Sequence, residues 1–129
     1  MTGNLLDTNV VLITLTRPAK LSARMRKAII AGPNFLSAVV YWEVLLKVMK
    51  GALTVGEPRS WWLDALDLLA ATPLALQPEH VARVYSLPPI HGDPFDRVLI
   101  AQASVENLLL VTTDKEIPRY ASGHIRVLS

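Results

Sequence analysis

The sequence predicts an α/β fold with a central parallel sheet that is covered by helices on both faces. Segments of strand composition alternate with segments of helical spacing, and the strands are nearly continuous apolar runs, as is typical of strands buried on both faces. With 129 residues the chain has the length of one domain, because two halves would each be too small to hold a core unaided. We therefore expect a single domain over residues 1–129.

The first half of the chain contains two predicted strands and two predicted helices. The first strand is the apolar run 4–6, and 10–15 continues it as either a strand or a helix, since its apolar pattern fits both. Serine N-caps begin the next two helices, which end at a Gly-Pro pair and at a glycine. These helices span 22–31 and 37–50, with the short strand 35–36 between them.

The second half repeats the alternation, with proline as the usual signal in the first helical turn. Glu57-Pro58 begins one helix that runs to Thr72-Pro73, and Pro78 and Pro94 begin two more. The predicted ranges are helix 57–72, strand 74–76, helix 78–86, extended loop 87–92, helix 94–106, strand 108–112 and, after a brief helix, strand 125–128.

The composition excludes several classes of protein. Hydrophobic residues make up 51% and charged residues 19% of the chain, with a mean hydropathy of +0.33, so it is not a disordered chain. No apolar run is long enough to predict a membrane span, and the first residues carry no secretory signal. The absence of cysteine excludes a disulfide scaffold and a thiolate metal site, and it favours the cytoplasm.

The distribution of charge is more informative than the net charge of +2. Residues 8–42 contain five basic residues and no acid, and Lys20, Arg24 and Lys27 recur at helical spacing. This basic stripe suits either a nucleic-acid backbone or simply a solvated helix face. Acidic residues, by contrast, lie in or beside strongly apolar stretches. They are Asp7, Glu43, Asp93, Asp96 and Asp114.

Two of these acids follow predicted strands directly. Asp7 comes after the first strand and Asp114 after the fourth, and ligand sites gather at the carboxyl ends of parallel strands. Each of them also has a simpler explanation as the N-cap of a helix or as a turn residue.

The other acids lie on predicted helices. Glu43 interrupts an apolar helix that we expect to be largely buried, where it either pairs with Lys47 or binds a cation. Asp93 is placed to cap the helix that begins at Pro94, which leaves Asp96 in the first turn, free to face a ligand.

Together these acids predict an oxygen-lined pocket. Bunched carboxylates repel one another, so cations between them are needed at neutral pH. Oxygen ligands and the lack of cysteine favour Mg²⁺ or Mn²⁺ over zinc, and the three histidines are scattered. Hydroxyl groups expected around the same pocket are those of Thr8, Ser37, Thr112 and Thr113.

The order and spacing of four acidic motifs resemble the PIN-domain ribonucleases, and more narrowly the VapC toxins of bacterial toxin–antitoxin pairs. The motifs extend over about residues 4–127. They are Leu5-Leu6-Asp7-Thr8-Asn9, Ser37 followed by Glu43, His91-Gly92-Asp93-Pro94-Phe95-Asp96-Arg97 running into 98–103, and Leu110-Val111-Thr112-Thr113-Asp114. The resemblance implies a three-layer α/β/α sandwich, a homodimer and inhibition by a small antitoxin.

The resemblance also implies roles for particular residues. The catalytic, metal-binding quartet of the family falls on Asp7, Glu43, Asp96 and Asp114. Accessory positions fall on Thr8, Asn9, Asp93 and Thr112, although histidine is common in the subgroup where Asn9 stands.

Our main hypothesis is a metal-dependent endoribonuclease. One or two Mg²⁺ or Mn²⁺ ions held by the quartet would activate water for in-line attack on a phosphodiester, without a protein nucleophile. Basic residues would hold the RNA backbone away from the acidic pocket. They are Arg17, Lys20, Arg24 and Lys27, together with Arg97.

Two alternatives belong to other function classes. One is a binding module whose acidic site is inactive. The other is a phosphohydrolase with Asp7 as the nucleophile, which is disfavoured because Asn9 stands where a second acid is expected. Separately, Trp61 and Trp62 either pack in the core or, if one is exposed, anchor a second copy of the chain or the antitoxin.

Overall fold

The predicted parallel sheet is present. The computed structural model describes residues 2–89, 92–120, 123 and 125–129. In them one sheet has the strand order β3-β2-β1-β4-β5, and every neighbouring pair is parallel. The strands are β1 (Asn4–Leu6), β2 (Asn34–Ser37), β3 (Ala71–Leu74), β4 (Leu109–Val111) and β5 (Arg126–Leu128).

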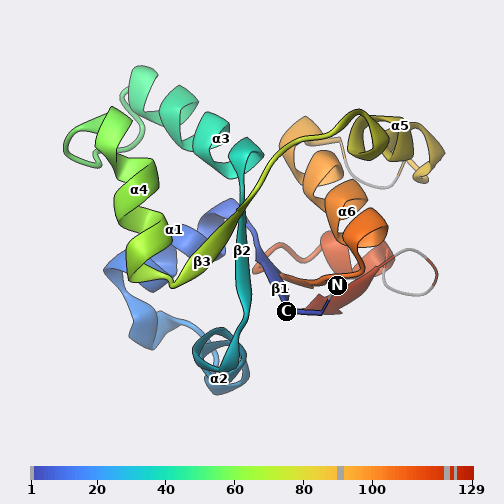
Figure 1. Ribbon diagram of the computed structural model, residues 1–129, viewed down its shortest axis with the longest axis horizontal. Helices are drawn as coiled ribbons and strands as arrows, with labels where there is room; N and C mark the ends of the chain where they lie inside the picture. The colour runs from blue at the N-terminus through green and yellow to red at the C-terminus, as the bar shows by residue number, and fades with distance from the viewer. Residues whose placement is uncertain (1, 90–91, 121–122, 124) are drawn as a thin grey trace.

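Helices flank this sheet on both sides, which confirms the predicted three-layer α/β/α arrangement. In Figure 1, α3 and α4 lie to the left of the central strands, and α5 and α6 lie to their right. The helices are α1 (Thr8–Thr16), α2 (Ala23–Ala31), α3 (Ala38–Met49), α4 (Pro58–Leu68), α5 (Pro78–Ser86) and α6 (Pro94–Glu106), with short 3₁₀ helices η1 (Pro18–Lys20) and η2 (Ile117–Tyr120).

The structure decides the ambiguous segment after β1 and corrects one strand. Residues 10–15 belong to helix α1. The strand predicted at 74–76 is wrong, because β3 spans Ala71–Leu74 and α4 ends at Leu68. Pro73 therefore lies inside a strand instead of ending a helix. The strand tolerates it because β3 is at the edge of the sheet, where one side of the strand needs no backbone N–H donor.

The register of the sheet aligns the carboxyl ends of its central strands. Leu6 of β1 pairs with Val111 of β4, so the residues that follow these two strands lie side by side. The backbone N–H of Asp7 donates to Val111 O at 3.1 Å, which continues the pairing by one residue. This edge of the sheet is therefore where side chains from separate parts of the chain meet.

The opposite, amino edge of the sheet is closed by α2. Asn4 Nδ2 donates to Ala28 O (2.9 Å) and to Asn34 Oδ1 (3.0 Å). Asn34 Nδ2 donates to Ile29 O (2.8 Å) and Leu69 O (3.3 Å). Two neutral amides at the first positions of β1 and β2 thus satisfy carbonyls at the end of α2, and they fix α2 at the edge remote from Asp7.

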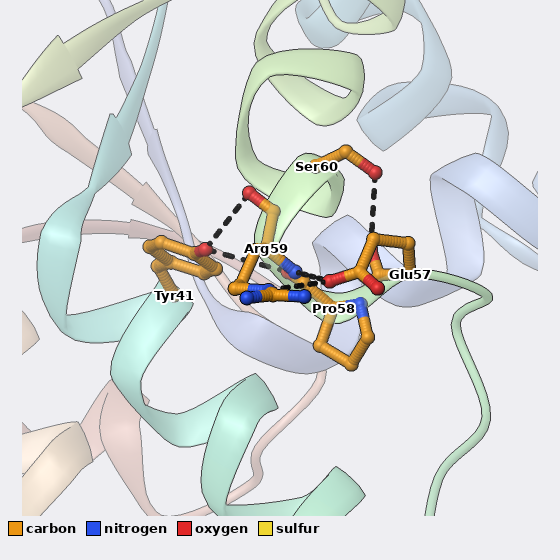
Figure 2. Close-up of polar contacts among 5 residues, drawn as sticks. All are labelled: Tyr41, Glu57, Pro58, Arg59 and Ser60. Atoms are coloured by element: carbon orange, nitrogen blue, oxygen red, sulfur yellow. Dashed lines mark hydrogen bonds and ion pairs between the residues drawn. The ribbon is translucent and has the colours of Figure 1, made fainter.

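Helix α3 is held against α4 by Tyr41. The Tyr41 hydroxyl lies within hydrogen-bond distance of Pro58 O (3.3 Å) and Arg59 O (3.2 Å), as Figure 2 shows. In the same turn Glu57 Oε1 accepts from Arg59 N at 3.0 Å and so caps α4. These contacts join α3 to α4, while burial of Val39, Val40 and Val44 turns the core face of α3 toward the sheet.

The prediction that α3 is largely buried is wrong in one respect. Only Val39, Val40 and Val44 of this helix are fully buried, whereas Trp42 and Met49 are 57% and 80% exposed. The helix is buried along one face and leaves apolar side chains on another.

The two adjacent tryptophans of α4 do not provide an exposed anchor. Trp61 is buried in the core, and Trp62 is half-buried and stacks on Tyr41 with ring centroids 5.2 Å apart. Core packing therefore accounts for Trp61.

Within the described residues, no helix has the length and apolar character that a membrane crossing requires.

Candidate active site

A polar cavity of about 240 Å³ opens at the carboxyl edge of the sheet. It collects side chains from the turn after β1, the middle of α3, the start of α6 and the turn after β4, four segments that are far apart in the sequence. Its lining residues are Asp7, Thr8, Asn9, Glu43, Lys47, Asp93, Asp96 and Asp114. All four acids of the predicted quartet line this one cavity, and so does the accessory Asp93.

Asp7 is the most buried of these acids, with 3% of its surface exposed. It is the N-cap of α1, because its Oδ1 accepts from Val10 N at 2.9 Å. Its Oδ2 accepts from the hydroxyl of Thr112. Each carboxylate oxygen therefore has one donor, which fixes the orientation of the group.

The surroundings of Asp7 do not favour its negative charge. Burial raises the pKa of the Asp7 carboxyl above its usual value, although the hydrogen bonds from Thr112 and the Val10 N–H oppose the rise. The negative charges of Asp114 and Glu43 raise this pKa further. A cation in the cavity would reverse the balance, because it favours the ionised carboxylate.

Glu43 faces Asp7 from α3. Its Oε1 accepts from Thr8 Oγ1 at 2.5 Å, and its Oε2 is 3.6 Å from Lys47 Nζ. Thr8 is itself buried at the start of α1. The hydroxyl that the resemblance assigned an accessory role thus ties the carboxylate of α3 to the first turn of α1.

The two acids of α6 have different positions in its first turn. Asp93 is the N-cap, since its Oδ1 accepts from the backbone N–H groups of Phe95 (2.9 Å) and Asp96 (3.3 Å). The predicted cap is therefore confirmed. Asp96 follows inside the helix and lines the cavity together with Asp93.

The turn after β4 places Asp114 through Thr112. Thr112 Oγ1 accepts from the Asp114 backbone N–H at 2.9 Å while its hydroxyl donates to Asp7. Asp114 Oδ1 in turn accepts from Glu116 N at 2.7 Å. One buried threonine therefore sets the positions of two of the four acids.

Three of the four predicted hydroxyl groups are not part of the cavity wall. Thr112 is fully buried behind the wall, where it holds Asp7 and Asp114. Ser37 is fully buried as the N-cap of α3, where it donates to Gln102 Oε1 at 2.6 Å. Gln102 lies next to His80, which pairs with Glu106 at 2.8 Å. Thr113 is exposed and does not line the cavity either. Ser37 supports the helix that carries Glu43 from behind the site.

The donor set fits a hard divalent cation. Every acidic ligand is an oxygen donor, and Mg²⁺ is usually bound through one or two carboxylates while it keeps several waters. Among the described residues, no group of three or more acidic or histidine side chains is arranged to hold a metal ion as the side chains stand.

The basic stripe lies elsewhere. Helix α1 carries the chain away from Asp7, and α2 packs at the amino edge of the sheet through Ala28 and Ile29. The cations of the stripe are exposed there, so they do not surround the acidic cavity as a neighbouring basic surface would. They are Arg17, Lys20, Arg24 and Lys27.

Arg97 also has a local partner set. Its guanidinium donates to Pro88 O (3.0 Å), Val84 O (3.2 Å) and the Tyr120 hydroxyl (3.3 Å). These bonds join α6 to the last turn of α5, to the segment after it and to η2. Residues 90 and 91 of that segment lie outside the described part of the chain. A role for Arg97 in RNA binding stays a prediction.

The cation beside the acids is Lys47. In the sequence, the spacing of Lys47 from Glu43 indicated only an ion pair, and the predicted RNA-binding residues did not include Lys47. The structure places Lys47 in the cavity wall, one helical turn beyond Glu43.

Comparison with known proteins identifies one family and several solved structures of similar fold. The PIN domain family matches residues 5–123. No curated protein matches the chain. Among solved structures, VapBC2 from Rickettsia felis bound to a promoter DNA fragment has a TM-score of 0.71 at 15% identity, covering 99% of this chain and 98% of that chain.

Two other solved complexes are similar over nearly their whole length. DNA-bound VapBC from Salmonella typhimurium has a TM-score of 0.69 at 17% identity, with 99% of this chain and 98% of that chain covered. A toxin–antitoxin complex from Klebsiella pneumoniae has a TM-score of 0.61 at 22% identity, with 98% and 96% covered. At these identities the likeness concerns the fold.

Proposed function

Because this chain belongs to the PIN domain family, we propose that it is a metal-dependent endoribonuclease and the toxin of a toxin–antitoxin pair. The observation that supports this most directly is the convergence of four acids, from four separate segments, on one cavity at the carboxyl edge of the sheet. A structural role for each acid alone would not require them to share a cavity.

The residues that would hold Mg²⁺ or Mn²⁺ are Asp7, Glu43, Asp96 and Asp114. When bound, the ion supplies an activated water and stabilises negative charge on the reacting phosphate. The protein contributes the orientation of the ligands: Thr112 fixes Asp7 and Asp114, and Thr8 fixes Glu43. Such supporting hydrogen bonds commonly alter metal affinity or activity by about 10- to 100-fold.

The reaction would be hydrolysis of a phosphodiester by water. The water oxygen forms the new bond to phosphorus, the bond from phosphorus to one ribose oxygen breaks, and that oxygen leaves with a proton. No side chain needs to act as nucleophile. The second acid expected two residues after a nucleophilic aspartate is also absent, because Asn9 stands there.

A protein partner is the second part of the proposal. The similar structures are toxin–antitoxin complexes, and we propose that this chain binds a cognate antitoxin in the cytoplasm. An apolar cavity of about 340 Å³ between α1, α4 and the segment joining α3 to α4 is a candidate docking place. Its apolar wall includes Leu12, Leu15, Leu53, Val55, Trp61 and Leu68.

Cleavage of a structured RNA in the presence of Mn²⁺ tests the enzyme assignment. We expect Asp7→Asn and Asp96→Asn each to lower the cleavage rate about a hundredfold or more, because each removes a carboxylate that would hold the metal ion. Asp67→Asn is the matched control, since Asp67 is exposed on α4 and lies outside the cavity.

Equal cleavage by the wild type and both cavity variants would remove the quartet from catalysis. A titration with Mn²⁺ separates the enzyme from an inactive binding module: a wild-type protein that neither cleaves RNA nor binds Mn²⁺ would favour the module. The shared cavity of intact acids supports the enzyme.

We also propose a homodimer, in which the exposed face of α3 is covered. Trp42 and Met49 are seven residues apart, hence on one face of the helix, and both are largely exposed. Met49→Glu is expected to lower the mass in solution from that of a dimer to that of a monomer, measured by light scattering. Tyr85→Glu on α5, at a position that is 96% exposed, should leave the mass unchanged. A monomeric wild type would contradict the proposal.

A further inference from the structure

Lys47 is the one basic residue among the described side chains that line the acidic cavity. It lies on α3, and its Nζ is 3.6 Å from Glu43 Oε2. This separation is within the range of an ion pair but is longer than a normal hydrogen bond. The N–H groups of the ammonium are therefore not committed to that carboxylate.

The ion pair with Glu43 is a weak reason for a lysine at this position. Ion pairs of this spacing on a helix contribute little to stability, and the Lys47 side chain is 37% exposed. Glu43 is already oriented without it, because its other oxygen accepts from Thr8 at 2.5 Å. Lys47 is thus not required to position Glu43.

The location becomes significant once the acids hold a cation. A metal ion would take over the charge of Glu43, and the ammonium would then face a second positive charge in the same cavity. That arrangement is stable when an anion lies between the two. A phosphodiester entering the cavity is such an anion, and its two non-bridging oxygens can contact the ion on one side and an ammonium on the other.

We propose that Lys47 is a catalytic residue that donates a hydrogen bond to a non-bridging oxygen of the scissile phosphate. The inference rests on the proposed phosphodiester hydrolysis and adds a residue outside the acidic quartet. Negative charge on the non-bridging oxygens changes as the water oxygen bonds to phosphorus and the ribose oxygen departs. Lys47 transfers no proton in this step; it contributes a fixed positive charge and a donor next to that developing charge.

No other basic side chain lines this cavity in the described part of the structure. The basic stripe is exposed around α2, which packs at the opposite edge of the sheet. Arg97 is engaged by Val84 O in the last turn of α5 and by Pro88 O just after that helix. Phosphate contacts by those residues would therefore concern nucleotides away from the bond that breaks.

The test uses the full-length protein with Lys47→Met, which keeps the length of the side chain without its charge. We expect turnover of RNA with Mn²⁺ to fall roughly a hundredfold. Binding of a short fluorescein-labelled oligoribonucleotide, measured by anisotropy with Ca²⁺ in place of Mn²⁺, should weaken several-fold. The affinity for Mn²⁺ alone should stay equal or increase, because the ammonium no longer competes for Glu43.

Two further variants complete the design. Lys47→Arg keeps a donor and a positive charge and should recover most of the lost turnover. Lys50→Met, at the exposed end of α3 and outside the cavity, should behave as the wild type. Thermal melting of each variant checks that it folds.

Several outcomes would overturn the inference. Turnover by Lys47→Met within about twofold of the wild type would do so, as would a parallel loss of Mn²⁺ affinity, which indicates that Lys47 only supports Glu43. If the wild type itself neither cleaves RNA nor binds the labelled oligoribonucleotide, the proposed function fails, and the role of Lys47 fails with it. If the wild type is active and the Lys47→Met variant is equally active, the catalytic role of Lys47 is rejected and the proposed function is not.

Discussion

The two edges of the sheet both bury polar side chains, but they bury different kinds. At the amino edge, Asn4 and Asn34 are neutral amides that donate to carbonyls of α2 and of the turn after α4. At the carboxyl edge, Asp7 and Glu43 are acids that line the same cavity. A fully paired amide stabilises the fold, whereas neighbouring carboxylates oppose it until a cation arrives. Buried polarity marks a functional site when it is charged and incompletely compensated.

The basic stripe on the surface differs from the acidic cavity in how its charges are arranged. It is the most conspicuous charge feature in the sequence, yet its members extend into solvent from the short stretch between the end of α1 and the middle of α2. The acids come from four segments, and each is less conspicuous alone. Convergence in space, more than local charge density, distinguishes the acidic cavity.

Substitutions at the amino edge should lower the free energy of unfolding more than substitutions at the carboxyl edge. Asn34→Ala removes the donors to Ile29 O and Leu69 O and the acceptor for Asn4. We expect a loss on the order of 2 kcal/mol in the free energy of unfolding, since buried polar groups are left unpaired. Urea denaturation measures it.

The same variant should keep its cleavage rate per folded molecule at a temperature where it remains folded. A loss of activity without a loss of stability would contradict the division between the two edges.

At the carboxyl edge, replacing the charged Asp7 by a neutral residue should raise the stability of the metal-free protein. Since the pKa of Asp7 is raised in the folded protein, the stability that its neutral form provides is present below the ordinary value of 3.8 and is lost as the pH rises through the raised pKa. At neutral pH without metal, Asp7→Asn is therefore expected to raise the Tm, on the order of a few degrees.

Melting curves with a chelator across the acid range measure this effect. The gain should disappear as the pH falls below 3.8, where the wild-type carboxyl is protonated in both states. Asp64→Asn, at an exposed position of α4, is the control. An Asp7→Asn variant that is less stable at neutral pH would show that the carboxylate is structurally favourable.

The smallest effect is expected from the basic stripe. The combined variant Lys20→Gln, Arg24→Gln and Lys27→Gln should cleave a short oligoribonucleotide at a rate within about twofold of the wild type, because these side chains lie at the other edge. A long RNA should bind more weakly and with a smaller dependence on salt, as expected when phosphate contacts are lost. Filter binding at several salt concentrations measures this, and unchanged long-RNA binding would leave the stripe as a solvated helix face.

The sequence was a good guide where local and tertiary signals agree. Ser22 and Ser37 cap helices as predicted, and Asp93 caps α6. Pro73 misled the assignment of β3, because the residue disrupts most strands and its tolerance at an edge depends on the order of strands.

The acids of the candidate site were predictable from the sequence, but the cavity that they line was not. The apolar runs before Asp7 and Asp114 indicated strand ends, and these ends do lie together. The spacing of four residues placed Lys47 beside Glu43, but it did not place both in one cavity with acids from three other segments. That shared cavity depends on how α3 packs against the rest of the chain, through its buried face of Val39, Val40 and Val44 and through the Tyr41 contact with α4.

Three consecutive residues of α3 have three different surroundings. Tyr41 contacts α4, Trp42 packs edge-on against Phe95 of α6, and Glu43 lines the cavity. Successive residues of a helix are about 100° apart, so deleting one residue upstream would turn all three side chains out of place together. Insertions and deletions in such a chain are therefore expected to accumulate in the segment between α3 and α4, whereas the length of the chain from Ser37 to Lys47 is constrained during evolution.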